Sequence, residues 1–250
     1  NTKMKSVAGH QPNLYPYPGF FAKIAMVNCF VIVDNVQYVK KEYHNRNKIK
    51  FSDGTAKWLS IPVKNTNRYK QLIMDAEIDN SKDWRKIHKR SIELNYRKAP
   101  FFNDFFPVIE ALLSLEWQKN AEYNIAFIKE TAKFLSIKTP IFRASELNIT
   151  GEASNLIANI CLKTKSEIYL HGIHALDYVD FNLLAEKNIK SLIQKFSCPH
   201  YPQLYNNFIP NLSIIDLIMN CGGKKSLEII QQGSQIFTEE EARTYLSKIP

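Results

Sequence analysis

Cysteines are few in this chain, and they lie far apart. Cys29, Cys161, Cys198 and Cys221 are the four cysteines among 250 residues, and none forms a Cys-x-x-Cys pair. This spacing argues against both a disulfide-stabilised secreted fold and a cysteine-based zinc site. We therefore expect reduced thiols and no bound metal.

Long apolar runs and targeting signals are also missing. No apolar run reaches the roughly 18 residues of a membrane-spanning helix, and no charged-then-apolar leader opens the chain. No internal repeat or low-complexity segment stands out. These absences predict a globular protein without a transmembrane segment, located in the cytoplasm.

Apolar, aromatic and basic residues are what the sequence has in quantity. Apolar residues make up 45% of the chain and aromatic residues 12%, which is enough for a large core. We expect one α/β domain over residues 4–250. With 33 basic against 24 acidic residues, the net charge of +9 favours anionic partners such as nucleotides, phosphorylated sugars, nucleic acid or an anionic membrane surface.

The most informative segment is a polar, proline-rich run at residues 9–20. A short apolar stretch precedes it, and the apolar segments Phe20–Val27 and Cys29–Asp34 follow. This order predicts a strand, a helix and a buried parallel strand. Ligands of open α/β sheets bind beyond the carboxyl ends of the strands, so we expect the polar residues of this loop to bind a ligand. The alternative is that these side chains only form hydrogen bonds with the backbone of a turn. The candidate site residues on this loop are His10, Gln11 and Asn13.

A basic and aromatic segment follows the second predicted strand. It contains five basic residues between positions 40 and 50 against one acid. Arginine binds phosphate or carboxylate with two parallel hydrogen bonds, and tyrosine rings provide surfaces for stacking. We expect this segment and the loop at 9–19 to form two walls of one pocket. The alternative is that the segment is only a solvated basic surface. Its candidate ligand-binding residues are Tyr38, Tyr43, His44, Asn45, Arg46 and Lys48.

The middle of the chain predicts a hairpin followed by helices. An Asp-Gly turn separates strand-like runs at 46–51 and 58–63, which indicates an antiparallel hairpin. Residues 81–136 are expected to be helical, with a break at Ala99-Pro100 because the residue before proline avoids helical geometry. In the first of these helices the helical spacing predicts one buried side. Its members are Trp84, Ile87, Ser91 and Leu94.

A second strand, histidine, glycine and helix arrangement occurs at residues 167–193. The predicted strand at 167–170 is followed by a loop with His171 and His174, which lack a third metal ligand nearby. We favour a hydrogen-bonding or acid/base role for them, with a structural role equally weighted. Further on, Ser213–Asp216 resembles a capping box, and the helix that it opens is expected to end at Gly222-Gly223.

Together these segments predict an α/β, Rossmann-like fold. It has a mostly parallel sheet with flanking helices, a β-hairpin and a mostly helical insertion near 81–136. The candidate catalytic residues are His10 and His171, at the ends of two predicted strands. No serine or cysteine nucleophile is recognisable beside a histidine, so a direct transfer is preferred to a covalent intermediate.

An ordered series of motifs extends over nearly the whole chain. Its segments are His10–Asn13, Gly19–Ile24, Asp34–Tyr38, His44–Ile49, Tyr96–Pro100, Tyr169–Gly172, Tyr201–Gln203 and Leu212–Asp216. This series resembles the WbqC-like protein family, whose members commonly read Tyr-Leu-Pro-Trp-Leu-Gly where this chain has residues 14–19. The family is associated with bacterial O-antigen and other surface-polysaccharide gene clusters, which implies work on a nucleotide-linked sugar or a related glycan precursor.

The opening of the chain also resembles HIGH-type nucleotidyltransferases, whose loop histidines contact nucleotide phosphates, although Gly19-Phe20-Phe21 replaces the second histidine. The leading hypothesis is a transferase that modifies a nucleotide-linked amino sugar or another anionic small molecule. His10 is its first acid/base candidate, and Arg46 and Lys48 would hold pyrophosphate or a carboxylate. A non-catalytic glycan-precursor or nucleotide-binding protein is the alternative, and RNA binding is the third option. The residues indicate no particular cofactor.

Overall fold

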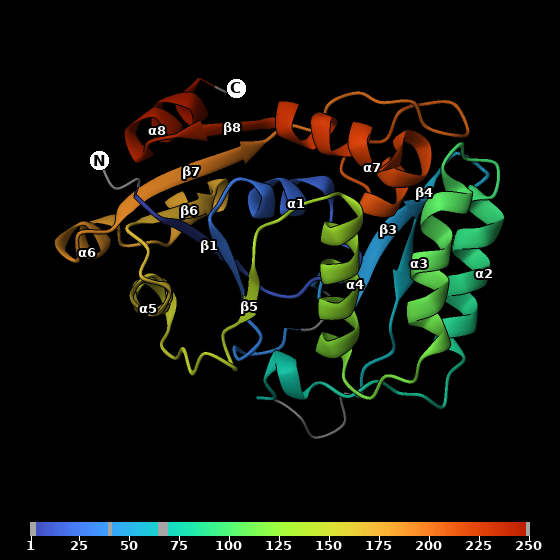
Figure 1. Cartoon of the computed structure of the whole chain (residues 1–250), viewed down its shortest axis with the longest axis horizontal. Helices are drawn as coiled ribbons and strands as arrows, with labels where there is room; N and C mark the ends of the chain where they lie inside the picture. Colours follow the sequence, from blue (N-terminus) through green and yellow to red (C-terminus); the bar gives the residue numbers. More distant parts are fainter. Residues whose placement is uncertain (1–3, 40–41, 65–69, 249–250) are drawn as a thin grey trace.

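The computed structural model describes residues 4–39, 42–64 and 70–248 of the chain (Figure 1). Its central sheet has six strands in the order β5-β2-β1-β6-β7-β8, and every neighbouring pair is parallel except β7 with β8. The predicted α/β fold with a mostly parallel sheet is confirmed. The strands are β1 (Ser6–His10), β2 (Cys29–Ile32), β5 (Ile141–Arg143), β6 (Ile168–Gly172), β7 (Lys190–Phe196) and β8 (Ser234–Phe237).

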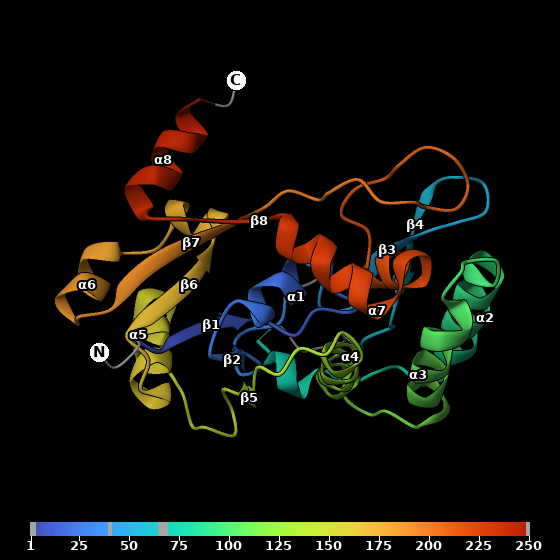
Figure 2. The same ribbon diagram turned by 45° about the horizontal axis from the view of Figure 1, so that its top comes forward.

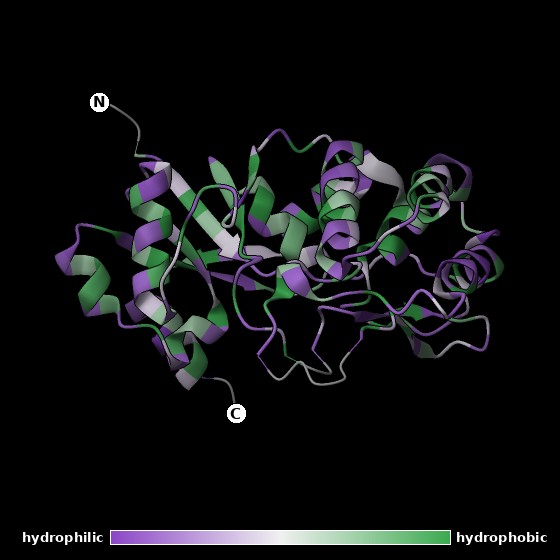
Figure 3. Cartoon of the chain, turned by 90° about the horizontal axis from the view of Figure 1, so that it is seen from below, coloured by the Kyte–Doolittle hydropathy of each residue, from purple (hydrophilic) through white to green (hydrophobic). Residues whose placement is uncertain are grey.

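Alternate residues of the central strands pack into cores on opposite faces of the sheet. Val7 and Val31 belong to a core that includes α5 (Ala153–Thr164) and α6 (Phe181–Glu186). Their neighbours Ala8 and Ile32 belong to the larger core that includes α1 (Pro18–Ala25) and α7 (Ile214–Gln232). Such alternation explains the continuous apolar runs in these strands, because both faces are covered. In Figure 3 the helices carry both hydrophilic and hydrophobic turns, as expected of helices with one face against a core.

The predicted hairpin and helices form the other half of the molecule. Strands β3 (Arg46–Lys50) and β4 (Ala56–Ser60) pair antiparallel. Beside them, on the right in Figure 1, stand α2 (Trp84–Tyr96), α3 (Phe102–Ser114) and α4 (Asn120–Phe134), away from α5 and α6 on the left. The expected break at Ala99-Pro100 falls between α2 and α3. Among the described residues, no helix combines the length and the apolar character needed to cross a bilayer.

Three short elements complete the chain. Two are 3-10 helices, η1 (Ile73–Asp75) and η2 (Ile173–Asp177), and the third is the C-terminal helix α8 (Glu239–Ser247). In Figure 2 α8 projects from the edge of the sheet that ends in β7 and β8. A capping box formed by Thr238 and Glu241 begins this helix.

Helix α2 buries only part of the side that the sequence predicted. Trp84 is buried as expected, but Ile87 and Leu94 are 56% and 49% exposed. His88 is buried instead and bonds to the Tyr15 hydroxyl at 2.8 Å and to the Ser60 carbonyl at 2.9 Å. The prediction was wrong for Ile87 and Leu94 because buried polar residues with hydrogen-bond partners occupy positions that a purely apolar pattern does not count. The buried residues of α2 are Trp84, His88, Ile92, Asn95 and Tyr96.

Helix α7 consists of two helical segments that meet at Gly222, where the sequence predicted the helix to end. Gly222 has a left-handed backbone (φ 74°) that kinks the helix, and the chain resumes helical geometry as far as Gln232. A side chain at this glycine would collide with the ring of Phe101, 2.7 Å from an added Cβ. Ser213 does cap the helix, accepting from the backbone of Ile215 at 3.2 Å, but the expected capping box is absent from it. The glycine therefore ends the first helical segment, as the sequence predicted, and permits a kink against the start of α3 before the second segment begins.

Candidate functional site

A crevice opens at the carboxyl edge of the sheet between β1 and β6. Strand β1 leads through α1 to β2 on one side, and β6 leads through α6 to β7 on the other. The two strands pair at only two positions, Ser6 with Ile168 and Val7 with Tyr169, and beyond these the Gly9 amide donates to the Tyr169 hydroxyl at 3.1 Å. The strands therefore separate at the switch point where open α/β sheets bind ligands.

The crevice contains a cavity of about 310 Å³. Histidine, tyrosine and lysine dominate its polar lining, and no aspartate or glutamate is among the described residues that line it. A cavity with cationic and neutral groups and no carboxylate is suited to an anionic ligand. The polar lining residues are His10, Tyr17, Lys23, Tyr169, His171, His174, Tyr178, Gln194 and Lys195.

His10 ends β1 and presents one free ring nitrogen. Its Nδ1 lies 2.9 Å from the Gln11 carbonyl oxygen, which can only accept, so Nδ1 carries the proton and Nε2 keeps a lone pair. The ring packs edge-on against Phe20, with centroids 4.9 Å apart. Burial, and then the positive charge of Lys23, lowers the pKa of His10 to about 4. At neutral pH His10 is therefore an uncharged proton acceptor.

Lys23 is the cation of the crevice. It comes from the middle of α1, and only 8% of the residue is exposed. Gly172 makes room for it, because a Cβ at that glycine would lie 3.3 Å from the lysine Nζ. Burial lowers the pKa of Lys23 to about 8, which leaves the amine mostly protonated at pH 7.

His171 lies inside β6 and not on the loop that the sequence predicted. Its Nε2 is 3.0 Å from the Ser191 hydroxyl on β7, and its ring lies between Tyr169 and Phe181. Burial and then the charge of Lys23 lower its pKa to about 3. The strand runs to Gly172, two residues beyond the predicted end, because β7 continues beside it through Gln194. His174, on η2, is exposed at the rim of the cavity.

The buried histidines should make stability depend on pH. His88 and His171 have folded-state pKa values of about 4 and 3, below the usual histidine value of 6.5, because burial disfavours their charged forms. As the pH falls from about 6.5 toward 4, the unfolded chain gains protons that the folded chain excludes. The free energy of unfolding should then fall by up to about 1.4 kcal/mol per pH unit for each histidine. Above about pH 6.5 this contribution is fully present.

Denaturant unfolding at a series of pH values between 4.5 and 7.5 would measure this slope. The matched variant is His88→Gln, which lowers overall stability but should also make the slope shallower. Equal free energies of unfolding at both ends of the pH range would contradict the prediction.

Four of the other predicted site residues have structural partners. Gln11 accepts a hydrogen bond from Nε2 of His44, and Tyr38 packs against the same imidazole, with centroids 5.4 Å apart. Burial raises the pKa of Tyr38 to about 12 and lowers that of His44. Asn45 donates to the Ile61 carbonyl at 2.9 Å. These contacts join the loop after β1 to the start of the hairpin.

Three more predicted residues gather around Trp58 on the hairpin. The Arg46 guanidinium lies 4.3 Å and the Lys48 amine 4.8 Å from the centre of the indole ring, and the Tyr43 ring is 6.0 Å away. Trp58 and Tyr43 are 40% and 49% exposed. We call Tyr43, Arg46, Lys48 and Trp58 the hairpin platform. It is a surface feature, whereas the histidines lie in the crevice.

The structure differs from the prediction that the two loops wall one pocket. They do touch, since the Leu14 amide donates to the Tyr43 carbonyl at 2.9 Å. None of the described residues between 42 and 50 lines the cavity around His10, however, and neither does Asn13, which is half-buried on its loop. Lys40 and Lys41 lie outside the described residues.

Lys23, Tyr17 and Tyr169 are crevice residues that sequence reasoning missed. A signal existed for Lys23, because it is the one charged residue in the otherwise apolar helix Pro18–Ala25. Burial of an unpaired amine costs free energy, so a lysine at a buried position indicates a functional role. No comparable signal marks the tyrosines, whose position depends on the separation of β1 from β6.

Cysteine side chains do not line the crevice, and the histidines that do are not grouped as a metal site. Cys29, Cys161, Cys198 and Cys221 are all free thiols. Within the described part of the chain, no three His, Cys, Asp or Glu side chains are grouped as a metal site would require. The chemistry of the crevice therefore has to be argued from imidazole, phenol and amine groups.

Comparison with known proteins identifies the family. The family model of the WbqC-like protein family matches residues 11–228. The chain belongs to this family. The uncharacterized protein Rv1507c of Mycobacterium tuberculosis is 32% identical to this WbqC-like chain over 223 residues, which are 88% of the chain and 96% of the relative. No solved structure matches it.

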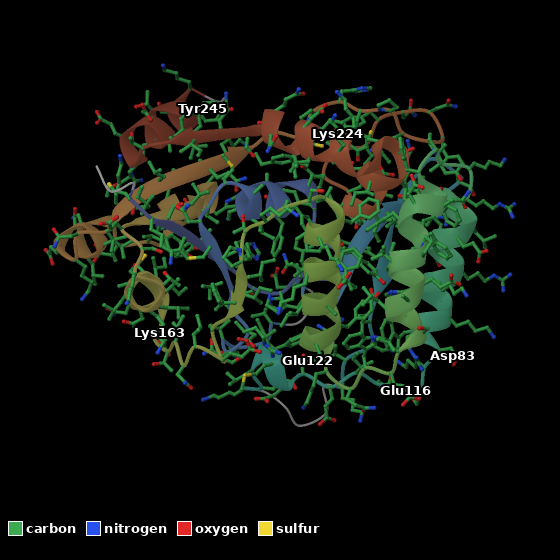
Figure 4. The ribbon with its side chains drawn as sticks, viewed as in Figure 1. Asp83, Glu116, Glu122, Lys163, Lys224 and Tyr245 are labelled. Atoms are coloured by element: carbon green, nitrogen blue, oxygen red, sulfur yellow. The ribbon has the colours of Figure 1, made fainter. Side chains whose placement is uncertain are left out.

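One motif residue of this WbqC-like protein, Asp34, holds the framework of the sheet. Asp34, fully buried after β2, accepts from Nε of Arg143 at 2.9 Å and from the Ser145 hydroxyl at 2.6 Å. Arg143 also contacts Glu122 of α4 at 2.8 Å, and Figure 4 labels this glutamate on its helix. The carboxylate that ends the second strand therefore links the sheet to α4 and is not free to bind a ligand.

Proposed function

We propose that this protein is an enzyme of surface-polysaccharide biosynthesis that transfers a group to a nucleotide-linked amino sugar bound in the β1–β6 crevice. One observation carries the proposal. Two histidines from the ends of different strands line one cavity at the switch point of the sheet, and His10 has a ring nitrogen available for a proton. Membership of the WbqC-like family supports the choice of substrate class.

In this proposal His10 acts as the general base. The amino or hydroxyl group of the sugar attacks the donor, its new bond forms as the bond to the donor's leaving group breaks, and Nε2 takes the proton of the attacking group. His171 is the second candidate for proton transfer, because it lines the same cavity and also contacts Ser191. The donor is an activated acyl or similar group that reacts directly, without a covalent enzyme intermediate.

A panel of ligands tests the proposal. Nucleotide-linked amino sugars, the same nucleotides without sugar, and unphosphorylated amino sugars are added singly to the protein, and thermal shift and calorimetry report binding. Binders are then incubated with acyl donors or ATP, and mass spectrometry reports any product. A rise in melting temperature with nucleotide-linked amino sugars and a product of increased mass would support the proposal. Failure of every nucleotide-linked sugar to bind would reject it.

The hairpin platform favours a second candidate, a glycan-precursor-binding surface without catalysis. Two exposed aromatic rings lie there beside two cations that contact the indole ring of Trp58. Aromatic rings can stack on a flat ligand while the cations contact its anionic groups. This surface retains the binding role that the sequence suggested for Tyr43, Arg46 and Lys48, but places it outside the crevice.

Arg46→Ala distinguishes a binding platform from surface decoration. If the platform holds an anionic precursor, the substitution should weaken binding by about 1.5–3 kcal/mol, the range for a hydrogen bond to a charged group, with little change in stability. Calorimetry with the best binder of the panel measures this effect. Lys57→Ala is the control on the same hairpin, because Lys57 pairs with Asp53 at the turn. Equal affinities for wild type and Arg46→Ala would leave the platform without a binding role.

A further inference from the structure

Lys23 is a buried cation without a carboxylate partner. Its side chain passes from α1 into the crevice, and none of the ion pairs among the described residues involves it. The described groups with which it interacts electrostatically are His10 and His171, both uncharged at neutral pH. A protein normally pairs a buried charge, because removing it from water is costly.

The surroundings of Lys23 supply hydrogen-bond donors from several directions. The hydroxyl of Tyr169 accepts from the Gly9 amide and keeps its own hydrogen to donate. Tyr17 and Lys195 line the same cavity from the start of α1 and from β7. Donors spread over three elements suit a ligand with several acceptor oxygens, whereas one carboxylate would use few of them.

We infer that Lys23 is the phosphate-binding residue of the crevice and holds the diphosphate of the ligand beside His10. The inference rests on the proposed function, because it places the diphosphate of a nucleotide-linked sugar in the same cavity. It moves the anion-binding role from Arg46 and Lys48, where the sequence put it, to a lysine 92% buried. Gly172 lies close beside this amine, because a Cβ added there would be 3.3 Å from the lysine Nζ.

The test uses inorganic pyrophosphate as the probe, with inorganic phosphate and acetate compared at equal ionic strength. Calorimetry measures the affinity of the wild type, of Lys23→Met and of Lys163→Met. Methionine keeps the length of the lysine stem and removes the charge, so Lys23→Met is expected to fold with an unchanged or higher melting temperature. Lys163 is the control, because it is exposed on α5 and is labelled at the rim of the molecule in Figure 4.

Pyrophosphate should bind the wild type more tightly than phosphate does, and acetate should bind weakest. Lys23→Met should lose about 10- to 100-fold in pyrophosphate affinity, and Lys163→Met should lose none. Unchanged affinity in Lys23→Met would overturn the inference, and so would a wild type that binds no pyrophosphate or prefers acetate. If Lys23→Met does not fold, Lys23→Gln gives the same comparison with a polar, uncharged side chain.

The two proposals fail differently. If pyrophosphate binding depends on Lys23 but no nucleotide-linked sugar binds, the phosphate site stands and the proposed substrate is wrong. If a nucleotide-linked sugar binds equally well to wild type and Lys23→Met, the substrate stands and the role of Lys23 is wrong.

Discussion

His10→Asn is expected to lower turnover about 10²- to 10⁴-fold while leaving ligand affinity nearly unchanged, which is the effect of losing a positioned proton-transfer group. Asparagine can still donate to the Gln11 carbonyl through its amide, so the loop after β1 should keep its shape. It cannot accept a proton where Nε2 does. Turnover and affinity are measured on the same folded variant with the substrate from the ligand panel.

The pH profile gives this experiment a second readout. With a pKa of about 4 for His10, the kcat/KM of the wild type should fall as the pH is lowered toward 4, because protonation removes the acceptor. The charged and titratable groups that influence this histidine are Lys23 of α1 and His44 of the neighbouring loop. His200→Asn, on an exposed loop outside the crevice, is the control. Near-wild-type turnover of His10→Asn with the same pH profile would remove His10 as the base and make His171 the next residue to test.

Asp216→Asn is expected to lower the free energy of unfolding by about 2–4 kcal/mol, the largest effect on stability that we predict for one substitution. Asp216 is 1% exposed, and its two oxygens accept hydrogen bonds from the hydroxyls of Tyr96 and Tyr201, both at 2.8 Å. Asparagine offers one oxygen, and its amide would face the second hydroxyl. Burial raises the pKa of Asp216, while the tyrosine bonds and the nearby charge of Lys50 oppose that rise.

This network fixes the long loop that precedes α7. Lys50, 1% exposed, donates to the carbonyls of Asn206 and Asn207, and Gln203 donates to Tyr201 at 3.0 Å. Losing the carboxylate therefore weakens several contacts together. Denaturant unfolding measures the change, and the exposed Asp53→Asn on the hairpin turn is the control. Tyr96→Phe combined with Asp216→Asn should cost less than the sum of the two single changes. Equal unfolding midpoints for wild type and Asp216→Asn would contradict this account.

The sequence predicted helices, strands and turns well wherever the conformational preferences of nearby residues determine them. The break at Ala99-Pro100 falls between α2 and α3, the Asp-Gly turn joins β3 to β4, and the apolar run after Asn28 forms β2. Errors occurred where a polar side chain is buried or where a second helical segment follows a glycine. His88 and Asn95 are buried polar residues of α2, and Gly222 kinks α7, because distant partners satisfy or fill those positions.

For the site, the sequence identified the two strand ends but not the residues that complete the crevice. His10 and His171 were predicted separately, each from its own strand and the polar residues after it. The basic segment at 40–50 was expected beside them because it follows the next strand along the chain. In space the hairpin turns its cations toward Trp58, and the crevice receives residues from α1, β6 and β7 instead.

By itself the sequence determined the fold class, the family, and the presence of histidines at the ends of two parallel strands, because these depend on local patterns and ordered motifs. Only the tertiary structure decided which groups meet. The strand order places β6 beside β1 although about 160 residues separate Gly9 from Tyr169 along the chain. That pairing, and the space above Gly172, bring Lys23 between two neutral histidines. No local sequence pattern predicts that these three side chains lie together, because their arrangement depends on packing between distant segments.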